Sequence, residues 1–384
     1  MKQHRPEVAD VIRTHQYDFL ARWSHVLSRE QKRALQALGD CRTAVLGGHR
    51  YLCDRCEHRV LLYNSCRNRH CPKCRATARA KWLAERQAEL LPVPYFHVVF
   101  TLPQQIGRLA IQNPRRIYSI LFQAASETLL TIAADPKHLG ASIGFLAVLH
   151  TWGQNLHLHP HLHCVVPGGG LSPNGTRWIA CRKSFFLPVR VLSRLFRKKF
   201  LRALGTAFRN GKLHFSGELR NLADPSAFRA LCQQAARIEW VVYAKPPFGG
   251  PERVLKYLAR YTHRVAISNH RLRALESGRV TFDWKDYAHR NRTGTMTLDA
   301  VEFIRRFLLH ILPSGFVRIR QFGFLANRVR KQKLELCRAL FAARQLPNSP
   351  ADIKDPHLCP SCKLGRLLVV EVLAPESTAI QDTS

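Results

Sequence analysis

Two pairs of closely spaced cysteines constrain the fold of this chain more than any other feature. Within each pair two residues intervene, and fourteen residues separate the pairs, which are Cys53 with Cys56 and Cys71 with Cys74. This spacing matches that of a zinc ribbon, in which two such knuckles place four thiolates tetrahedrally around one zinc ion. We therefore predict a zinc site formed by these four cysteines.

Further cysteines and histidines leave the ligand set open. The alternative ligands in the same stretch are His58, Cys66 and His70. A second pair, Cys359 and Cys362, forms half of another zinc knuckle near the end of the chain. One pair cannot fill a tetrahedral site, so a second zinc ion there needs more ligands, and His357 and Cys337 are the candidates.

The charge balance limits the class of partner. The 384 residues include 60 Lys and Arg against 26 Asp and Glu, which gives a formal net charge of +34. Because 46% of the residues are hydrophobic, the chain can build packed cores, and such a cationic folded protein is expected to bind a polyanion. Nucleic acid is the first candidate and an anionic membrane the second. The sequence has no apolar run of membrane-spanning length and no signal-peptide core at its start, so we expect a cytoplasmic protein that binds no membrane.

Hydrophobic periodicity predicts an α+β protein with an antiparallel sheet. Helices are expected within 7–45 and over 76–91, 115–133, 252–264 and 300–312. Strands are expected at 60–63, 95–101, 143–152, 161–166, 238–243, 279–284 and 295–298. The predicted domains are a helical and zinc-binding domain over 1–91, a catalytic domain over 92–315 and a basic C-terminal region over 316–384.

A histidine-rich strand is a candidate metal site. His161 and His163 are two residues apart, so in a strand both side chains point to the same face and can bind one ion. His150 and Gln154 are tentative third ligands on the preceding strand. The alternative is that these are half-buried histidines at a strand end. Residues 136–217 contain no Asp or Glu, which disfavours a nuclease whose two metal ions are held by clustered carboxylates.

Two tyrosines form a third candidate site. Tyr257 and Tyr261 are four residues apart and would lie on one face of the helix predicted over 252–264. Such a pair is more often a packing contact, but the basic neighbours Lys256, Arg260 and Arg264 favour a phosphate ligand and stabilise a phenolate nucleophile.

Basic residues elsewhere predict further contacts with DNA. Around the cysteines the candidates are Arg67, Arg69 and Lys73. In the cationic, amphipathic segment 182–212 they are Arg197, Lys198 and Lys199. Side chains of this kind bind the phosphate backbone, although a solvated basic surface is the alternative.

Four motifs together resemble the IS91 family of two-tyrosine insertion-sequence transposases. They are YLARYTHRVAISN at 257–269, HPHLHCVVPGGG at 159–170, FHVVFTLP at 96–103 and SCRNRHCPKC at 65–74. The resemblance implies the HUH endonuclease fold, an antiparallel sheet flanked by helices, preceded by a zinc-binding domain. It matches His161 and His163 to the HUH metal pair and Tyr257 and Tyr261 to the nucleophiles, and it implies Mg or Mn as the metal.

The function implied by this resemblance is strand transfer on DNA. A tyrosine would attack one strand and form a 5′-phosphotyrosine, and the preferred DNA would be single-stranded transposon ends. Two alternatives stay open from the sequence. One is a zinc-dependent DNA-binding protein without cleavage activity, and the other is a rolling-circle plasmid replication initiator with the same chemistry.

Overall fold

A computed structural model describes residues 5–74, 82–83, 85–87, 89–182, 186–245, 266–286, 292–341 and 357–376. The chain packs as two compact units, and each is discontinuous in sequence. Unit 1 comprises 1–80, 263–311 and 348–384, and unit 2 comprises 81–262 and 312–347.

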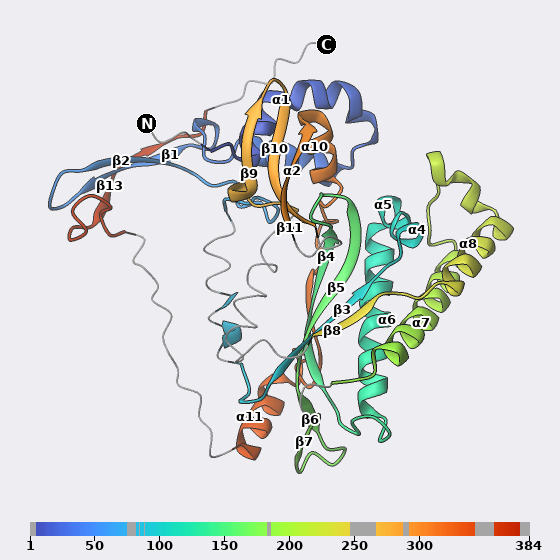
Figure 1. The fold of residues 1–384 in the computed structure, drawn as a ribbon. Coiled ribbons are helices and arrows are strands. Elements are labelled where there is room, and N and C mark those ends of the chain that lie inside the picture. Colours follow the sequence, from blue (N-terminus) through green and yellow to red (C-terminus); the bar gives the residue numbers. More distant parts are fainter. Residues whose placement is uncertain are drawn as a thin grey trace. The chain divides into compact units, whose positions relative to one another are not determined.

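Unit 2 is built on a five-stranded antiparallel sheet (Figure 1). Its strands in spatial order are β12 (Ile319–Gly323), β4 (Gly144–Trp152), β5 (Leu158–Pro167), β3 (Tyr95–Thr101) and β8 (Val242–Lys245). The strands predicted at 95–101, 143–152 and 161–166 are confirmed as β3, β4 and β5. The strand predicted at 238–243 is observed as β8, which begins at Val242 and ends at Lys245. The expected antiparallel pairing of β4 with β5 is also confirmed.

One face of this sheet is the main apolar core. Phe100, Leu149 and Leu162 are fully buried there, and they pack against α6 (Pro114–Ala134) and α7 (Val189–Arg209). The two helices lie against each other on the same side of the sheet (Figure 1). Among the described helices, α6 has the length and apolarity of a membrane span, but 67% of its apolar window is buried within the protein. Its apolar residues are therefore accounted for by core packing.

Unit 2 contains further elements among its described residues. The helical ones are α4 (Gln104–Gly107), α5 (Leu109–Gln112), η3 (Gly217–Ala223), α8 (Pro225–Arg237) and α11 (Arg330–Leu340). A two-stranded ribbon is formed by β6 (Gly169–Leu171) and β7 (Trp178–Ala180). The second face of the large sheet carries a smaller apolar cluster, which contains Val148, Val165 and Leu334.

The helical part of unit 1 begins with α1 (Val8–Trp23) and α2 (Arg29–Gly39), which confirms the predicted helices there. At the start of α2, the Ser28 hydroxyl accepts from the Gln31 backbone N–H, and the Gln31 side chain accepts from the Ser28 N–H. This reciprocal cap is the one expected of Ser followed three residues later by Gln. Short helices η1 (Ser24–Val26) and η2 (Ala44–Leu46) follow α1 and α2 respectively.

A second part of unit 1 comes from the middle of the chain. It contains η4 (Asn269–Arg271) and a sheet in the order β11 (Arg292–Asp299), β10 (Arg279–Asp286) and β9 (Leu272–Glu276). Helix α10 (Ala300–Leu308) follows and packs against α1. The strands predicted at 279–284 and 295–298 and the helix after them are thereby confirmed, although α10 ends before the predicted residue 312.

The third part of unit 1 joins the two ends of the chain. Strand β1 (Gly48–Cys53) lies between β2 (Arg59–Tyr63) and β13 (Leu367–Leu373), and both pairings are antiparallel (Figure 1). The region 316–384, expected to follow the catalytic domain as a separate part, thus contributes a strand to the N-terminal sheet. The domain boundaries at 91 and 315 stay a prediction about function, because the packing units cross them.

Candidate functional site

Three histidines meet on the second face of the large sheet in unit 2. The register of β4 with β5 places His150 directly opposite His161, and His163 follows on the same face of β5. One ring nitrogen from each of the three histidines lies within 4.8 Å of the others. His150 and His163 are buried, and His161 is half-buried. Of the two tentative third ligands, His150 joins this cluster, and Gln154 lies in the connection after β4.

The hydrogen bonding of His161 leaves one nitrogen available to a metal. Its Nδ1 lies 2.6 Å from the backbone oxygen of His159, and because a carbonyl only accepts, Nδ1 carries the proton and donates. Burial, with a smaller effect of His159, lowers the pKa of His161 to about 3, so the ring is neutral at neutral pH. In that tautomer Nε2 presents its lone pair, which is the form of imidazole that binds metals.

A fourth histidine lies behind His163 and was not among the predicted site residues. His97 on β3 is diagonal to His163 across the strand pair, and its Nε2 lies 2.7 Å from Nδ1 of His163. The two rings are stacked, with centroids 4.9 Å apart. Burial, together with the nearby Lys245, lowers the pKa of His97 to about 4, and burial also lowers the pKa of His163. Two neutral rings share this hydrogen bond, so the tautomers of the two histidines are coupled.

The predicted contacts on α7 lie on the other side of the sheet. This helix packs on the face that holds the main core, whereas the histidines lie on the second face. Arg197 donates 2.6 Å to the backbone oxygen of Ile238, and Lys199 pairs with Glu127 at 3.1 Å, while Lys198 is exposed. Any DNA contact made by these residues is therefore separate from the histidine cluster.

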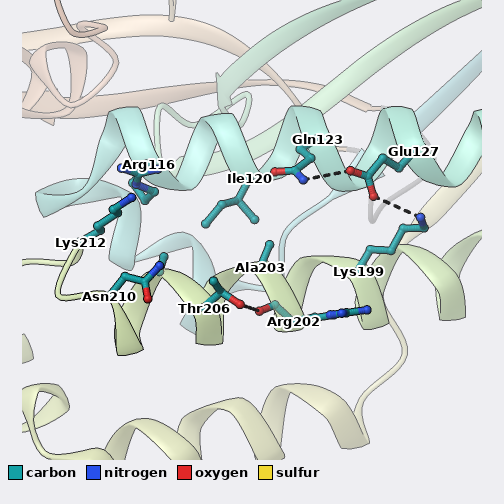
Figure 2. A pocket seen from close by; sticks show the side chains of 11 residues that line it. Arg116, Ile120, Gln123, Glu127, Lys199, Arg202, Ala203, Thr206, Asn210 and Lys212 are labelled. Atoms are coloured by element: carbon teal, nitrogen blue, oxygen red, sulfur yellow. Dashed lines mark hydrogen bonds and ion pairs between the residues drawn. The ribbon is translucent and has the colours of Figure 1, made fainter.

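A basic pocket lies between α6 and α7 (Figure 2). It has a volume of about 410 Å³, and its cationic lining residues are Arg116, Lys199, Arg202 and Lys212. Figure 2 shows the Glu127 carboxylate bridging Gln123 of its own helix and Lys199 of α7. One acidic side chain thus offsets part of the positive charge of this pocket.

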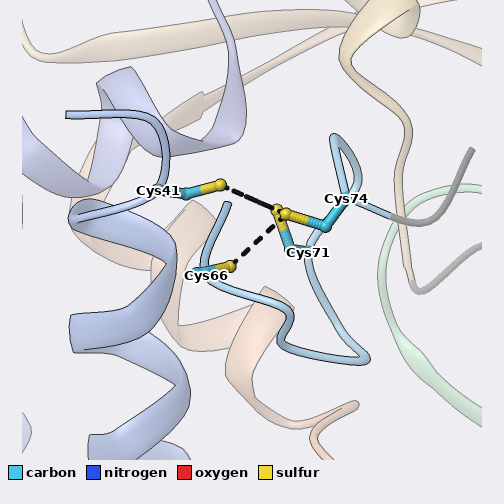
Figure 3. Close-up of side chains that lie close together, drawn as sticks. All are labelled: Cys41, Cys66, Cys71 and Cys74. Atoms are coloured by element: carbon cyan, nitrogen blue, oxygen red, sulfur yellow. Dashed lines mark hydrogen bonds between the residues drawn. The ribbon is translucent and has the colours of Figure 1, made fainter. Parts of the chain in front are cut away.

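The cysteines form two groups in unit 1. The first, which we call the N-terminal quartet, consists of Cys41, Cys66, Cys71 and Cys74 (Figure 3). The Sγ of Cys74 lies 3.3 Å from that of Cys41 and 3.6 Å from that of Cys66. Hydrogen bonds from the Cys66 and Cys71 thiols lower the pKa of Cys41, which favours a thiolate at that position.

The second group, which we call the split quartet, consists of Cys53, Cys56, Cys359 and Cys362. The expected grouping of the two N-terminal pairs around one zinc ion is therefore corrected. The pairing of β1 with β13 places the first N-terminal pair beside the C-terminal pair. The expected completion of the C-terminal pair is corrected as well. Cys337 is buried in the apolar cluster of unit 2, and the cysteines that lie beside Cys359 and Cys362 are Cys53 and Cys56.

The basic residues near the N-terminal quartet have different surroundings. Lys73 pairs with Glu7 at 2.8 Å, which offsets its charge. Arg67 is exposed and has a positive φ of 50°. Arg69 is half-buried. Arg67 is thus the most accessible of the three for a phosphate.

The predicted nucleophiles lie outside the described residues. This applies to Tyr257 and Tyr261 and to their basic neighbours Lys256, Arg260 and Arg264. Their roles therefore continue to rest on the sequence.

Two family models match the chain. The model described as "Putative transposase" matches residues 144–333, and the one described as "Transposase zinc-binding domain" matches residues 11–102. The chain is 31% identical to the transposase for insertion sequence element IS801 of Pseudomonas savastanoi pv. phaseolicola, over 81% of this chain and 75% of that protein. It belongs to the IS91 family of transposases. Its N-terminal region is accordingly a zinc-binding domain, and the three clustered histidines fall within the region matched by the transposase model.

A second relative covers nearly the whole transposase. The putative transposase y4qJ of Sinorhizobium fredii is 55% identical over 97% of this chain and 96% of its own length. No solved structure matches the chain. The family is thus shown by sequence, and the α+β architecture with antiparallel sheets is shown by the structure.

Proposed function

We propose that this transposase cleaves and rejoins single DNA strands through a 5′-phosphotyrosine intermediate, with Tyr257 and Tyr261 as nucleophiles. The observation that carries the proposal is the cluster of three histidines on one face of the antiparallel sheet. A histidine metal cluster combined with a pair of tyrosine nucleophiles is the constellation of an HUH endonuclease, and we assign unit 2 to that fold. The substrate would be single-stranded transposon ends.

The histidine cluster suits a divalent metal ion. His150, His161 and His163 would hold it through imidazole nitrogens, and among the described residues this group contains no carboxylate. The ion would be Mg or Mn and would act as a Lewis acid on the scissile phosphate. Of these two, Mn is the better fit, because nitrogen donors favour a transition metal over Mg.

The tyrosines would conserve the energy of the cleaved bond. The phenolic oxygen attacks phosphorus, the bond from phosphorus to the 3′ oxygen breaks, and the leaving strand keeps a 3′-hydroxyl after gaining a proton. The 5′-phosphate is then joined to the tyrosine, and attack by a 3′-hydroxyl reverses the step. A second tyrosine allows cleavage at another site while the first linkage persists. Neither water nor a nucleotide is consumed.

Basic side chains would hold the strand in place. Lys256, Arg260 and Arg264 accompany the tyrosines in sequence and would contact the phosphate that is cleaved. Arg67 and Arg69 of the zinc-binding domain would contact DNA outside the scissile position. With a net charge of +34, sequence-independent attraction to DNA is expected to be strong and to fall with added salt.

An adduct assay tests the proposal. Labelled single-stranded oligonucleotides carrying transposon-end sequence are incubated with the protein and Mn, and covalent protein–DNA species are separated on a denaturing gel. We expect an adduct that is lost in the double variant Tyr257→Phe with Tyr261→Phe and in His161→Ala. Tyr17→Phe is the matched control, because Tyr17 is exposed on α1 in unit 1. Binding of the oligonucleotide without any adduct, or an adduct that survives the double substitution, would overturn the assignment.

A further inference from the structure

The split quartet brings together two loops of the same construction. In each loop two residues separate the cysteines, and the backbone folds back on itself in the same way. The N–H of Glu57 donates 3.2 Å to the oxygen of Cys53, and the N–H of Lys363 donates 3.0 Å to the oxygen of Cys359. Glu57 and Lys363, which follow the second cysteine of each pair, have positive φ values of 56° and 58°. Two knuckles of matching geometry thus face each other.

The sulfur positions fit one tetrahedral ion. Four sulfurs at the usual zinc–sulfur distance of about 2.3 Å lie about 3.8 Å from one another at the corners of a tetrahedron. In the split quartet, Sγ of Cys53 lies 3.8 Å from Sγ of Cys362, and Sγ of Cys56 lies 3.7 Å from Sγ of Cys359. These separations are far longer than the roughly 2.0 Å of a disulfide bond.

Backbone groups support thiolates at this position. The N–H of Arg55 points to Sγ of Cys53 at 3.4 Å, and the N–H of Gly365 points to Sγ of Cys362 at 3.3 Å. Donors of this kind stabilise negative charge on sulfur and fix the direction in which it faces. Gly365 also permits the close approach of the two loops, since a Cβ there would lie 2.5 Å from Sγ of Cys53.

We propose that the split quartet binds a second zinc ion, separate from the zinc of the N-terminal quartet. Cys359 and Cys362 lie outside both matched family regions, so the zinc-binding domain by itself supplies only half of this site. The second ion joins cysteines that are 303 residues apart, Cys56 and Cys359, and holds β13 beside β1. The zinc-binding domain is therefore completed by the C-terminal segment. This site does not depend on the proposed DNA cleavage.

Metal content tests the proposal directly. The full-length protein, purified under reducing conditions, is expected to hold two zinc ions per chain by elemental analysis. The variant Cys359→Ser with Cys362→Ser should hold one, and Cys232→Ser should still hold two. Cys232 is the matched control because it lies on α8 in unit 2, away from both quartets. One zinc ion in the unchanged protein, or two in the double variant, would overturn the proposal.

A measurement on the unchanged protein covers the case in which the double variant does not fold. The holoprotein is treated with N-ethylmaleimide before and after zinc chelation, and modified cysteines are located by mass spectrometry. If the split quartet holds zinc, its four thiols become reactive only after chelation. If Cys56 and Cys362, which are among its accessible members, react fully before chelation, the site does not bind zinc. Replacement of zinc by cobalt should add the absorption of two tetrathiolate sites per chain.

Discussion

The hydrogen bond between His97 and His163 determines which ring nitrogen of His163 is available to bind a metal ion. A neutral imidazole has one protonated nitrogen and one with a lone pair, so its two nitrogens cannot both accept. If Nδ1 of His163 donates to Nε2 of His97 across 2.7 Å, Nε2 of His163 is left with its lone pair directed away from β3. We therefore expect His97 to act as a positioning residue for the proposed metal site. Partners of this kind raise ligand basicity and fix ring orientation.

Replacing His97 is expected to weaken metal binding without removing a ligand. In His97→Leu the Mn affinity should fall by about 10- to 100-fold, the usual cost of losing such a partner. Mn binding can be followed by the electron paramagnetic resonance signal of the free ion. His138→Gln, at an exposed histidine after α6, is the control and should bind Mn as the unchanged protein does. Equal affinity in His97→Leu would show that the hydrogen bond has no role in metal binding.

Gly365 is expected to be required for the two cysteine loops of the split quartet to lie close together. In Gly365→Ala the new Cβ would overlap the sulfur of Cys53 and the Asp54 carboxylate, so the loops must move apart. We expect zinc to dissociate faster from this variant, measured with a chromogenic chelator. Gly205→Ala is the control, because the nearest atom to its added Cβ is a flexible arginine nitrogen 3.7 Å away and alanine favours a helix interior. Unchanged zinc release in Gly365→Ala would show that the close approach is not needed.

Among the elements, the large sheet of unit 2 separates two kinds of surface. Alternation along β5 sends Leu162 and Cys164 into the core beneath α6 and α7, and it sends His161 and His163 to the second face. The polar surface of α7 points away from that core, so its cations lie on the opposite side of the sheet from the histidines. Contacts by α7 would therefore strengthen DNA binding without touching the scissile phosphate.

Removing exposed cations from α7 is expected to change DNA affinity but not cleavage. Arg194 and Lys198 are one helical turn apart and exposed. If both contact phosphate, the variant Arg194→Ala with Lys198→Ala should lower the slope of log affinity against log salt by about 1.4 for single-stranded DNA. Fluorescence anisotropy over a salt series measures this slope, and Lys137→Ala serves as the control in a surface loop. An unchanged slope would mean that α7 faces solvent in the complex, and a slower cleavage rate at saturating DNA would place it near the site.

At the scale of the whole molecule, the cysteine quartets belong to one unit and the histidine cluster to the other. Unit 1 collects three segments that are far apart in sequence, and both quartets lie in it. Metal binding to such sites contributes directly to folding free energy, because the ligands are not held together in the unfolded chain. Joining distant segments closes a long loop, which costs conformational entropy, and metal binding would offset part of this cost.

Chelation of zinc is expected to destabilise unit 1 selectively. Scanning calorimetry should resolve two transitions, and a strong chelator should lower the midpoint of only one of them. Cys337→Ser is the control for unit 2. It changes a buried thiol of that unit and should lower the midpoint of the transition that the chelator leaves unchanged. If the chelator shifts neither transition, the quartets do not hold structural metal, and a shift of both would mean that the units unfold together.

The local elements could largely be predicted from the sequence, since their signals are local. The apolar run at 95–101, the alternation along 161–166 and the cap at Ser28 specify β3, β5 and the start of α2 without reference to distant residues. The same alternation placed His161 and His163 on one face. The family could also be predicted from the sequence, because each of its motifs is a contiguous stretch of residues.

Long-range pairing could not be read in this way. Which cysteines lie together depends on where β1 and β13 meet, and local spacing suggested a different grouping because Cys41 and the C-terminal pair are distant in sequence from the two N-terminal pairs. Similarly, His97 is one histidine in an apolar strand until the register of β3 with β5 brings it to His163. The sequence by itself determined the elements, the cationic character and the family. The tertiary structure alone decided how the cysteines and histidines are grouped, because side chains far apart in the chain meet only through strand register.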